Sequence, residues 1–467
     1  MSITYPTQPA VENSPEHASE KRLLLISYHF PPVGGAGVQR PLKFVKYLPE
    51  YGWMPTVLTA ENPSAPVFDD SLCRDFPTGL RIERARTWEP DYQLKSSLQQ
   101  QAAAKQRLSL KSWLARSVKS TAKLLLQPDP QILWLPNAYR RAVQVLRNTP
   151  HHALIATAPT YTNLILGAML KKRFGIPLLL DYRDEWDLSS KYLENRSQDW
   201  YSNFVQSRQQ AYVLRQADAL IATTQLSTDT LYRRALALGR DLPSLCIYNG
   251  YDAEDFEHLK TPAPRNDRFK LVYTGTLWRL TNIEPLVRAI EKLQVQYPRI
   301  VEKLEFHCVG RKLPEQQLFL DRLQRTACRL VTADYSPHEQ VVELMHSANA
   351  LCLLLTDLPG AERVAPGKLF EYLASQKPVL SILPEGETSR LVNRFHPDSR
   401  FTPRDIDGIA DWLHQAIRNH LAGDAPPAPR NADEIGQFSR VGQTGSLADL
   451  LNQVTHNSAA ASVVNIG

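Results

Sequence analysis

The sequence has 467 residues, 43% hydrophobic and 22% charged, which is an ordinary composition for a soluble enzyme of two to three domains. The net charge of +6 is too dilute over this length to form the dense basic stripe of a nucleic-acid binder, so no nucleic acid is expected as a partner. No apolar run reaches the roughly 20 residues that span a bilayer. Residues 1–20 lack the apolar core of a signal peptide. We therefore expect a cytoplasmic protein with a disordered tail at 1–20.

The cysteines are scattered along the chain and form no CxxC pair. The five cysteines are Cys73, Cys246, Cys308, Cys328 and Cys352. Their number is odd, and Cys246, Cys308 and Cys352 lie in apolar runs. This pattern predicts buried thiols in a reducing compartment, with no zinc site and no other metal.

Short apolar runs alternate with helical patterns, which predicts parallel sheets covered by helices. A first strand at residues 23–27 is followed by a loop at 29–37 and by a helix that ends at Gly52. That helix has an apolar face made of Val38, Leu42, Val45 and Leu48. Later strands of this half are predicted at 56–59, 153–156, 178–181, 219–222 and 245–248.

Residues 251–268 are charged and contain Pro262 and Pro264, which is typical of an interdomain linker. Beyond it the pattern predicts one helix capped by Asn282 and another that opens with a capping box at Ser336 and Glu339. Strands of this second half are predicted at 270–274, 305–309, 329–332, 350–355 and 379–382.

The resulting fold class is α/β, with two Rossmann-like domains at 21–250 and 269–437, a final helix at 438–455 and a disordered tail at 456–467. In open parallel sheets the ligand binds beyond the carboxyl ends of the strands, so two such sheets facing each other would share one cleft.

One segment, 92–128, departs from this alternation. It contains seven basic residues and no acidic one, and Arg116, Lys119 and Lys123 share a helical face with Trp113 among the apolar residues nearby. A basic amphipathic helix with tryptophan is typical of a segment that lies on an anionic membrane surface. The alternative is a helix packed on its own domain.

Two candidate ligand contacts belong to the first half. Gly34 and Gly35 precede a helix, where backbone N–H groups approach phosphates closely. A nicotinamide-dependent dehydrogenase would carry GxGxxG there, but Arg40 occupies the place of the third glycine. Asp184 lies just after a buried strand, where a carboxylate is placed to bind sugar hydroxyls or to orient a catalytic group. A salt bridge of Arg183 that braces this loop is the alternative interpretation.

Two more candidate ligand contacts belong to the second half of the chain. Thr274, Gly275 and Arg279 follow its first strand and offer hydrogen-bond donors and a cation suited to a diphosphate. Gly367 and Lys368 open a helix and are placed to bind an anion, with Glu371 one turn further on. A carboxylate there is suited to two vicinal ribose hydroxyls, so the set predicts a nucleotide site. The alternative is a surface Lys–Glu pair.

These pieces, in this order, resemble the retaining glycosyltransferases of the GT-B fold, in the large family that contains sucrose synthase and many bacterial polysaccharide enzymes. The most specific stretches are "YHFPPVGGAGVQRPLKFVKYLPEYGWMPTVLT" and "PGKLFEYLASQKPVL". The resemblance covers residues 21–455. It implies sugar transfer from a nucleotide-sugar donor to a glycan or lipid-linked acceptor, with retention of configuration and with no metal or other cofactor.

The resemblance also assigns roles to residues. Donor binding belongs to the second domain, where Arg279 and Lys368 would neutralise the diphosphate and Glu371 would bind the ribose. Gly34 and Gly35 would lie near the donor phosphate or the acceptor. Acceptors of the family often lie at a membrane, which fits the basic segment and implies a peripheral location on the inner face of the cell membrane.

Three positions depart from the family pattern. The residue eight before Glu371 is Arg363, where the family often has a glutamate that contacts the donor sugar. No lysine lies between Arg279 and Arg288, and Asn163 lies where many members have a histidine. These departures keep two alternatives open: a non-catalytic nucleotide-sugar-binding scaffold, and a sugar-nucleotide epimerase of the same fold.

Overall fold

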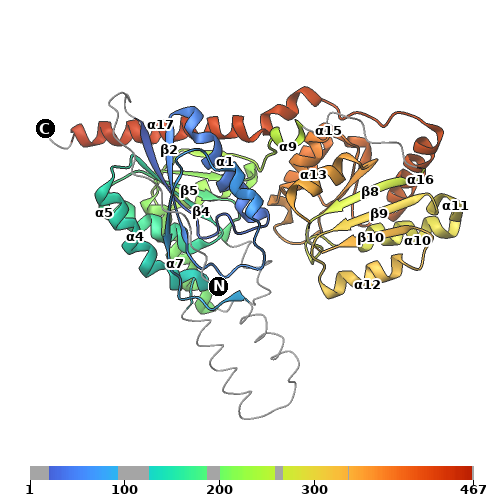
Figure 1. Ribbon diagram of the computed structural model, residues 1–467, viewed down its shortest axis with the longest axis horizontal. Helices are drawn as coiled ribbons and strands as arrows, with labels where there is room; N and C mark the ends of the chain where they lie inside the picture. Colours follow the sequence, from blue (N-terminus) through green and yellow to red (C-terminus); the bar gives the residue numbers. More distant parts are fainter. Residues whose placement is uncertain (1–19, 93–125, 187–199, 258–266, 335, 465–467) are drawn as a thin grey trace, which may run out of the picture.

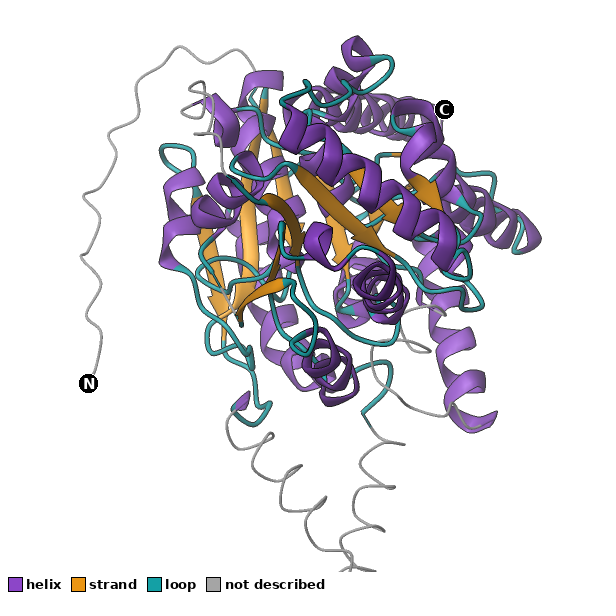
Figure 2. Ribbon diagram, turned by 90° about the vertical axis from the view of Figure 1, so that its right-hand side faces the viewer, coloured by secondary structure: helices purple, strands orange, loops and turns teal. Residues whose placement is uncertain are grey.

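The computed structural model describes residues 20–92, 126–186, 200–257, 267–334 and 336–464, which form two α/β domains lying side by side (Figure 1). Each domain is built on one parallel sheet with helices packed on both faces (Figure 2). The predicted fold class of two Rossmann-like domains is confirmed.

The first sheet contains seven strands in the order β3-β2-β1-β4-β5-β6-β7, all parallel. The chain order reverses between β1 and β4, which is the switch point beside which ligands of such sheets bind. The strands are β1 (Lys21–Ile26), β2 (Trp53–Ala60), β3 (Arg81–Ala85), β4 (Ala153–Ala158), β5 (Leu178–Tyr182), β6 (Ala219–Ala222) and β7 (Ser244–Cys246).

Successive side chains of a strand point to opposite faces, and both faces of the first sheet are apolar. Leu23 and Leu25 belong to one core cluster, and Leu24 and Ile26 belong to the other. The first face is covered by α1 (Ala36–Tyr47). The second is covered by α4 (Leu135–Asn148), α5 (Tyr161–Phe174), α7 (Trp200–Gln216) and α8 (Gln225–Ala237).

The second sheet contains six parallel strands in the order β10-β9-β8-β11-β12-β13. Its order also reverses, between β8 and β11. The strands are β8 (Phe269–Thr274), β9 (Leu304–Val309), β10 (Arg329–Ala333), β11 (Ala350–Leu354), β12 (Val379–Ile382) and β13 (Arg400–Phe401).

Two helical layers enclose this sheet. One layer comprises α10 (Glu284–Gln296), α11 (Pro298–Val301), α12 (Pro314–Leu323) and α16 (Ile406–Ala422). The other comprises α13 (His338–His346), α14 (Lys368–Ala374) and α15 (Glu387–Phe395). The short α9 (Glu254–Glu257) precedes the domain, and 3₁₀ helices occur at η1 (Leu48–Tyr51), η2 (Asp70–Asp75), η3 (Pro130–Trp134), η4 (Ala361–Arg363), η5 (Pro397–Ser399) and η6 (Ala432–Phe438).

The last helix, α17 (Arg440–Val464), leaves the second domain and runs along the first (Figure 1). Leu447, Leu451 and Val454 join the core cluster beneath α1. The predicted disordered tail at 456–467 is wrong up to Val464, because the helix continues through those residues. The middle turns of the helix are held by packing beneath α1, and helices propagate readily once nucleated.

Two predicted helix starts differ in detail. The α10 helix begins at Glu284, and the Asn282 carboxamide still accepts a hydrogen bond from the Glu284 N–H at 3.0 Å. The predicted capping box at Ser336 does not form, because the N-cap of α13 is Pro337, which makes no side-chain cap. Proline has a fixed φ and no N–H to share in a reciprocal box, so the helix starts one residue later than predicted.

The predicted basic amphipathic helix, including Trp113, Arg116, Lys119 and Lys123, lies outside the described residues. No helix in the described part of the chain is long and apolar enough to cross a membrane.

A buried ion pair connects the first sheet to the segment that leaves it. The Arg40 Nε atom on α1 lies 3.0 Å from Asp181 Oδ1 on β5, and both side chains are 1% exposed. Arg40 Nη1 also donates to the carbonyls of Ile247 and Tyr248, at 2.8 and 3.1 Å. Thr157 on β4 donates to the other Asp181 oxygen at 2.8 Å. Arg40 therefore fixes α1, β5 and the start of the linker relative to one another.

We predict that Asp181→Asn lowers the free energy of unfolding of the first domain by about 3 kcal/mol, because it leaves the buried Arg40 charge without its counter-charge. Urea denaturation followed by tryptophan fluorescence measures this loss. The matched control is Asp411→Asn on the exposed side of α16, which is expected to change stability by less than about 0.5 kcal/mol. A loss for Asp181→Asn no larger than the control's would contradict this role.

Candidate functional site

The loops at the carboxyl ends of β8 and β9 approach each other through two glycines. Gly275 follows β8 with φ +111°, and Gly310 follows β9 with φ +131°, a region that other residues rarely adopt. A Cβ atom on Gly310 would lie 2.2 Å from the Gly275 carbonyl oxygen. Glycine at both positions therefore lets the two loops touch and leaves the space above Gly275 to another side chain.

That side chain is Lys368, the first residue of α14. Its ammonium group lies 4.0 Å from the centroid of the Tyr273 ring and 2.7 Å from where a Gly275 Cβ would be. Within the described residues it has neither a hydrogen bond nor an ion pair. Burial lowers its pKa to about 8, and the nearby Cys352 and Cys308 thiols and the Glu371 carboxylate act in the opposite direction. A desolvated, unpaired cation at a strand end is suited to an incoming anion.

Glu371 lies one turn after Lys368 on the same helix. Its carboxylate also lacks a hydrogen bond and an ion pair among the described residues, and burial raises its pKa. The surface Lys368–Glu371 pair that was the alternative interpretation does not form among the described residues. Gly367 is the N-cap of α14. Because the helix has only seven residues, we expect a ligand to be bound by the two side chains and not by the helix dipole.

Arg279 and Thr274 differ in their availability. Arg279 is exposed and unpaired in the described part of the chain, in the loop that follows Gly275. Thr274 is buried, and both its N–H and its hydroxyl bond to the Tyr372 hydroxyl, at 3.1 and 3.0 Å. The Thr274 side chain therefore holds α14 against β8, whereas the Arg279 guanidinium is accessible to a ligand.

The glycine loop of the first domain opens α1. Gly35 is the N-cap with φ +97°, and the helix starts at Ala36. A Cβ atom on Gly37 would lie 3.1 Å from an Arg183 guanidinium nitrogen, so Arg183 lies against the start of the helix. Gly34 donates its N–H to the Val67 carbonyl at 3.0 Å.

Asp184 follows β5 at the same edge of the first sheet. Its carboxylate pairs with Arg183 at 3.0 Å and is 40% exposed. The salt bridge considered as the alternative for this residue is thus present, and the carboxylate remains accessible beside it.

The two domains meet through residues that follow strand ends. Arg363, after β11, pairs with Glu185, after β5, at 2.6 Å, and Thr224, after β6, donates to the Arg363 carbonyl at 3.0 Å. Glu387, after β12, accepts from the Tyr248 hydroxyl, after β7. Because each partner follows the carboxyl end of a strand, those ends of both sheets face each other, as the sequence predicted.

The three departures from the family pattern now have a structural description. Arg363 occupies the position where the family often has a glutamate. Its guanidinium pairs with Glu185 of the first domain and so bridges the two domains. Asn163 is buried, and its amide donates to the Thr157 carbonyl at 2.8 Å, so it supports β4. The loop after Gly275 carries Arg279 as its cation and no lysine.

Two residues that the sequence did not single out lie near Glu371. His338, at the start of α13, bonds to Asp255 at 3.0 Å. Burial alone would lower its pKa, but the Asp255 hydrogen bond and the charges of Glu371 and Asp255 raise it to about 9. Arg440, at the start of α17, is 5% exposed and interacts electrostatically with Glu371. Their positions depend on contacts between segments that lie far apart in sequence. No local motif predicts such contacts.

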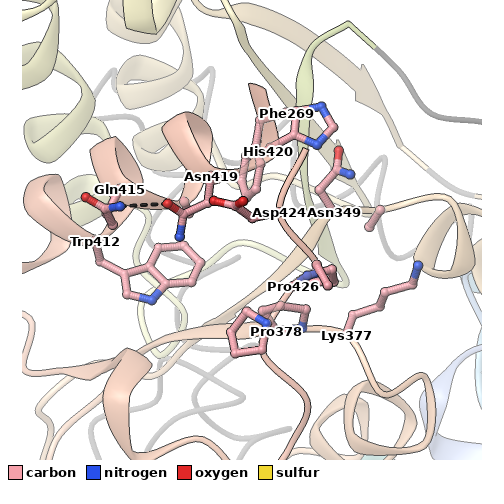
Figure 3. Close-up of a pocket in the computed structure, with 14 residues that line it drawn as sticks. Phe269, Asn349, Lys377, Pro378, Trp412, Gln415, Asn419, His420, Asp424 and Pro426 are labelled. Atoms are coloured by element: carbon pink, nitrogen blue, oxygen red, sulfur yellow. Dashed lines mark hydrogen bonds between the residues drawn. The ribbon is translucent and has the colours of Figure 1, made fainter. Parts of the chain in front are cut away.

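The described residues contain no group of three or more His, Cys, Asp or Glu side chains placed to hold a metal ion. They do contain a hollow of about 180 Å³ at the opposite edge of the second sheet. Trp412, Phe269, Lys377 and Pro426 line it (Figure 3). Phe269 begins β8, so this hollow lies at the amino ends of the strands, away from Lys368 and Glu371.

Comparison with known proteins tests the fold. No family model matches the sequence, and no curated protein matches it. Solved structures do match. A sucrose-phosphate synthase from Thermosynechococcus elongatus superposes with a TM-score of 0.58 at 15% identity, over 94% of this chain and 100% of that chain. The fold is GT-B.

Two further GT-B neighbours agree with this assignment. The N-terminal domain of a Candida albicans trehalose-6-phosphate phosphatase matches with a TM-score of 0.60 at 13% identity, over 93% of this chain and 97% of that one. A variant of S. aureus TarM, in complex with fondaparinux, α-GlcNAc-glycerol and UDP, matches with a TM-score of 0.53 at 9% identity, over 92% and 100%. At these identities the likeness establishes the fold, and function has to come from the residues.

The pKa of Lys368 gives a direct test of the site geometry. After reductive ¹³C-methylation, we predict one dimethyl-lysine NMR signal that titrates near pH 8, while exposed lysines titrate near their ordinary value of about 10.4. Lys368→Arg assigns the signal by removing it, and Lys292→Arg on α10 is the control that removes a different one. If the signal lost in Lys368→Arg titrates with the exposed lysines, the described burial of Lys368 is contradicted.

Proposed function

We propose that this protein is a glycosyltransferase that moves a sugar from a nucleotide-sugar donor to a glycan or lipid-linked acceptor, with retention of configuration, in the biosynthesis of a bacterial cell-surface polysaccharide. One observation carries the proposal. Lys368 and Glu371, one helical turn apart, are both desolvated and unpaired within the described residues. The carboxyl ends of the two sheets face each other in the same part of the molecule.

Leaving two opposite charges partly buried and unpaired is costly unless a ligand uses them. A nucleoside diphosphate fits both, because its diphosphate carries the anion for Lys368 and its ribose carries two hydroxyl donors for Glu371. Arg279 supplies a second cation in the loop that passes Gly275. The GT-B fold supports the proposal, since the TarM neighbour was solved with UDP and α-GlcNAc-glycerol.

In the proposed reaction the bond between the anomeric carbon and the diphosphate breaks, and the acceptor hydroxyl oxygen bonds to that carbon. Negative charge develops on the departing diphosphate, which takes up the hydroxyl proton. Lys368 and Arg279 would stabilise that charge with pre-placed cations, which is electrostatic rather than nucleophilic catalysis. Asp184, on the facing domain, would accept a hydrogen bond from a sugar or acceptor hydroxyl. Contact between the domains would exclude water and so disfavour hydrolysis of the donor.

The nucleotide site is tested by thermal unfolding in the presence of UDP, GDP, ADP, TDP or NAD. A ligand that binds only the folded protein raises the melting temperature, and at a hundred times its Kd the rise for domains of this size is about 5 to 10 °C. We predict a rise with one nucleoside diphosphate and its loss in Lys368→Ala and in Glu371→Ala. The matched controls, Lys292→Ala and Glu302→Ala, are expected to keep it.

If no nucleotide raises the melting temperature at millimolar concentration, the proposed donor site is contradicted. A rise that survives in both Lys368→Ala and Glu371→Ala would place nucleotide binding elsewhere. A rise with NAD alone would favour a nicotinamide-dependent enzyme.

A turnover assay separates the transferase from its two alternatives. With nucleotide-sugars alone, an epimerase interconverts the sugar, and a non-catalytic scaffold does nothing. We predict release of nucleoside diphosphate that depends on an added glycan or lipid-linked acceptor, and a fall of at least about a hundredfold in Lys368→Ala. Epimerised donor without acceptor would identify an isomerase, and binding without turnover for any donor and acceptor would identify a scaffold.

A further inference from the structure

Arg440 is a buried guanidinium that has no partner in the described part of the chain. The residue is 5% exposed, its Nη1 atom has no hydrogen bond, and no ion pair reaches its side chain among the described residues. Burial and the neighbouring charge of Arg40 lower its pKa, yet an arginine remains charged at neutral pH. A buried cation left in this state destabilises the protein unless it acts on a charge nearby.

The fold holds Arg440 beside the helix that carries Glu371. The Phe438 ring lies 5.0 Å from the Phe370 ring, and these two residues are close in sequence to Arg440 and Glu371. The segment η6, which leads into α17, packs on α14. Arg440 thus begins its helix next to a segment that packs on α14, and its charge acts on Glu371, although no ion pair joins the two among the described residues.

The start of α17 cannot relax easily toward Glu371. The Arg440 N–H donates to the Tyr251 carbonyl at 2.8 Å, and Tyr251 in turn donates to the Phe438 carbonyl at 3.1 Å. A Cβ atom on Gly250 would lie 2.3 Å from that same Phe438 carbonyl oxygen, so the linker and the helix start are in closest contact there. The main chain therefore fixes the position of Arg440.

The charged and titratable groups around Glu371 come from four helices. Lys368 and Tyr372 lie on its own helix, and burial keeps the Tyr372 phenol neutral by raising its pKa. His338 on α13 and Arg440 on α17 favour the ionised carboxylate, and Asp255 on α9 opposes it. Since Asp255 is hydrogen-bonded to His338, those two charges partly cancel, which leaves Arg440 and Lys368 as the cations that oppose the effect of burial.

We propose that Arg440 is a positioning residue for the nucleotide site, which keeps the Glu371 carboxylate ionised and free of internal bonds so that it can accept hydrogen bonds from ligand hydroxyls. The part of this inference that concerns the ligand rests on the proposed function. The coupling between Arg440 and Glu371 does not, and it is tested first without a ligand.

The first experiment is a double-mutant cycle on the full chain with Glu371→Gln, Arg440→Gln and the double variant, using melting temperatures at pH 8 and pH 4.5. Burial raises the folded-state pKa of Glu371, so its ionised form destabilises the folded protein at pH above that value and the effect disappears as the carboxyl group becomes protonated. Arg440 offsets this destabilisation. We expect Glu371→Gln to raise the melting temperature more in the Arg440→Gln background than in the wild type at pH 8, and equally at pH 4.5.

Arg440→Lys keeps the charge and is expected to behave as the wild type in this cycle. Arg418→Gln, which removes an exposed arginine of α16, is the matched control with no coupling to Glu371. If Arg440→Gln does not fold, the cycle is run with Arg440→Lys and Arg440→Met by the same readout. Equal effects of Glu371→Gln in all backgrounds at pH 8 would overturn the proposal.

The second experiment measures the affinity for UDP and for GDP by calorimetry at pH 5.5 and pH 7.5. Each unit of upward pKa shift at Glu371 costs about tenfold in the ionised fraction at pH below its pKa. We therefore expect Arg440→Gln to weaken binding more at pH 5.5 than at pH 7.5, and to add no pH dependence in the Glu371→Gln background. If Arg440→Gln weakens nucleotide binding equally at both pH values, Arg440 has only a structural role and the proposal is overturned.

The two outcomes separate the proposals. If neither UDP nor GDP binds the wild type, the proposed function loses its support, and the ligand-free cycle still decides whether Arg440 acts on Glu371.

Discussion

The arrangement of this protein depends on one buried guanidinium. Arg40 reaches from α1 through the core to Asp181 on β5 and to the carbonyls of Ile247 and Tyr248, where the chain leaves the first domain. A charge buried this deeply is stable only while its partners stay in place, so the pair constrains the geometry more than it contributes net stability. The path of the chain from the first domain to the second is set there.

That path places the linker against the second domain. The Asn249 amide donates to the Ala365 carbonyl at 3.2 Å, two residues before Gly367. Asp252 is held by Lys43 and Tyr47 of α1, both at 2.6 Å. Burial would raise the pKa of Asp252, but the charge and hydrogen bond of Lys43 and the Tyr47 hydroxyl lower it to about 2. This segment is therefore fixed to the first domain by charges and to the second by the side-chain amide of Asn249.

This fixed frame permits charges in the site that have no partner among the described residues. Side chains free to move would let Lys368, Glu371 and Arg440 neutralise one another. Instead, α14 is held to β8 by Tyr372 and Thr274, and the start of α17 is held to the linker by Tyr251. Charges kept apart in this way are pre-placed for a ligand, which is the arrangement that electrostatic catalysis requires.

The central strands were predictable from sequence because their apolar runs are buried on both faces. Residues 219–222 and 379–382 form β6 and β12 with the predicted bounds. Strand β3 was missed because it lies at a sheet edge and its sequence, Arg-Ile-Glu-Arg-Ala, has little apolar character. Strand β13 was missed because two residues carry no periodicity.

The site was predictable in part for a similar reason. Lys368 and Glu371 are one turn apart, so a local spacing indicates them. Thr274 was predicted as a ligand donor, but its partner Tyr372 lies 98 residues away, and no local pattern reveals that hydrogen bond. The same holds for Arg440 and for the Arg363–Glu185 bridge across the domains. Contacts set by tertiary structure require the structure.

A crystal structure of the protein with a bound nucleoside diphosphate would show whether Lys368 and Glu371 hold the nucleotide. We expect the diphosphate beside Lys368 and above Gly275, with the ribose hydroxyls bonded to Glu371. A nucleotide bound instead in the hollow between Trp412 and Lys377, with the Lys368 and Glu371 side chains untouched, would contradict this expectation.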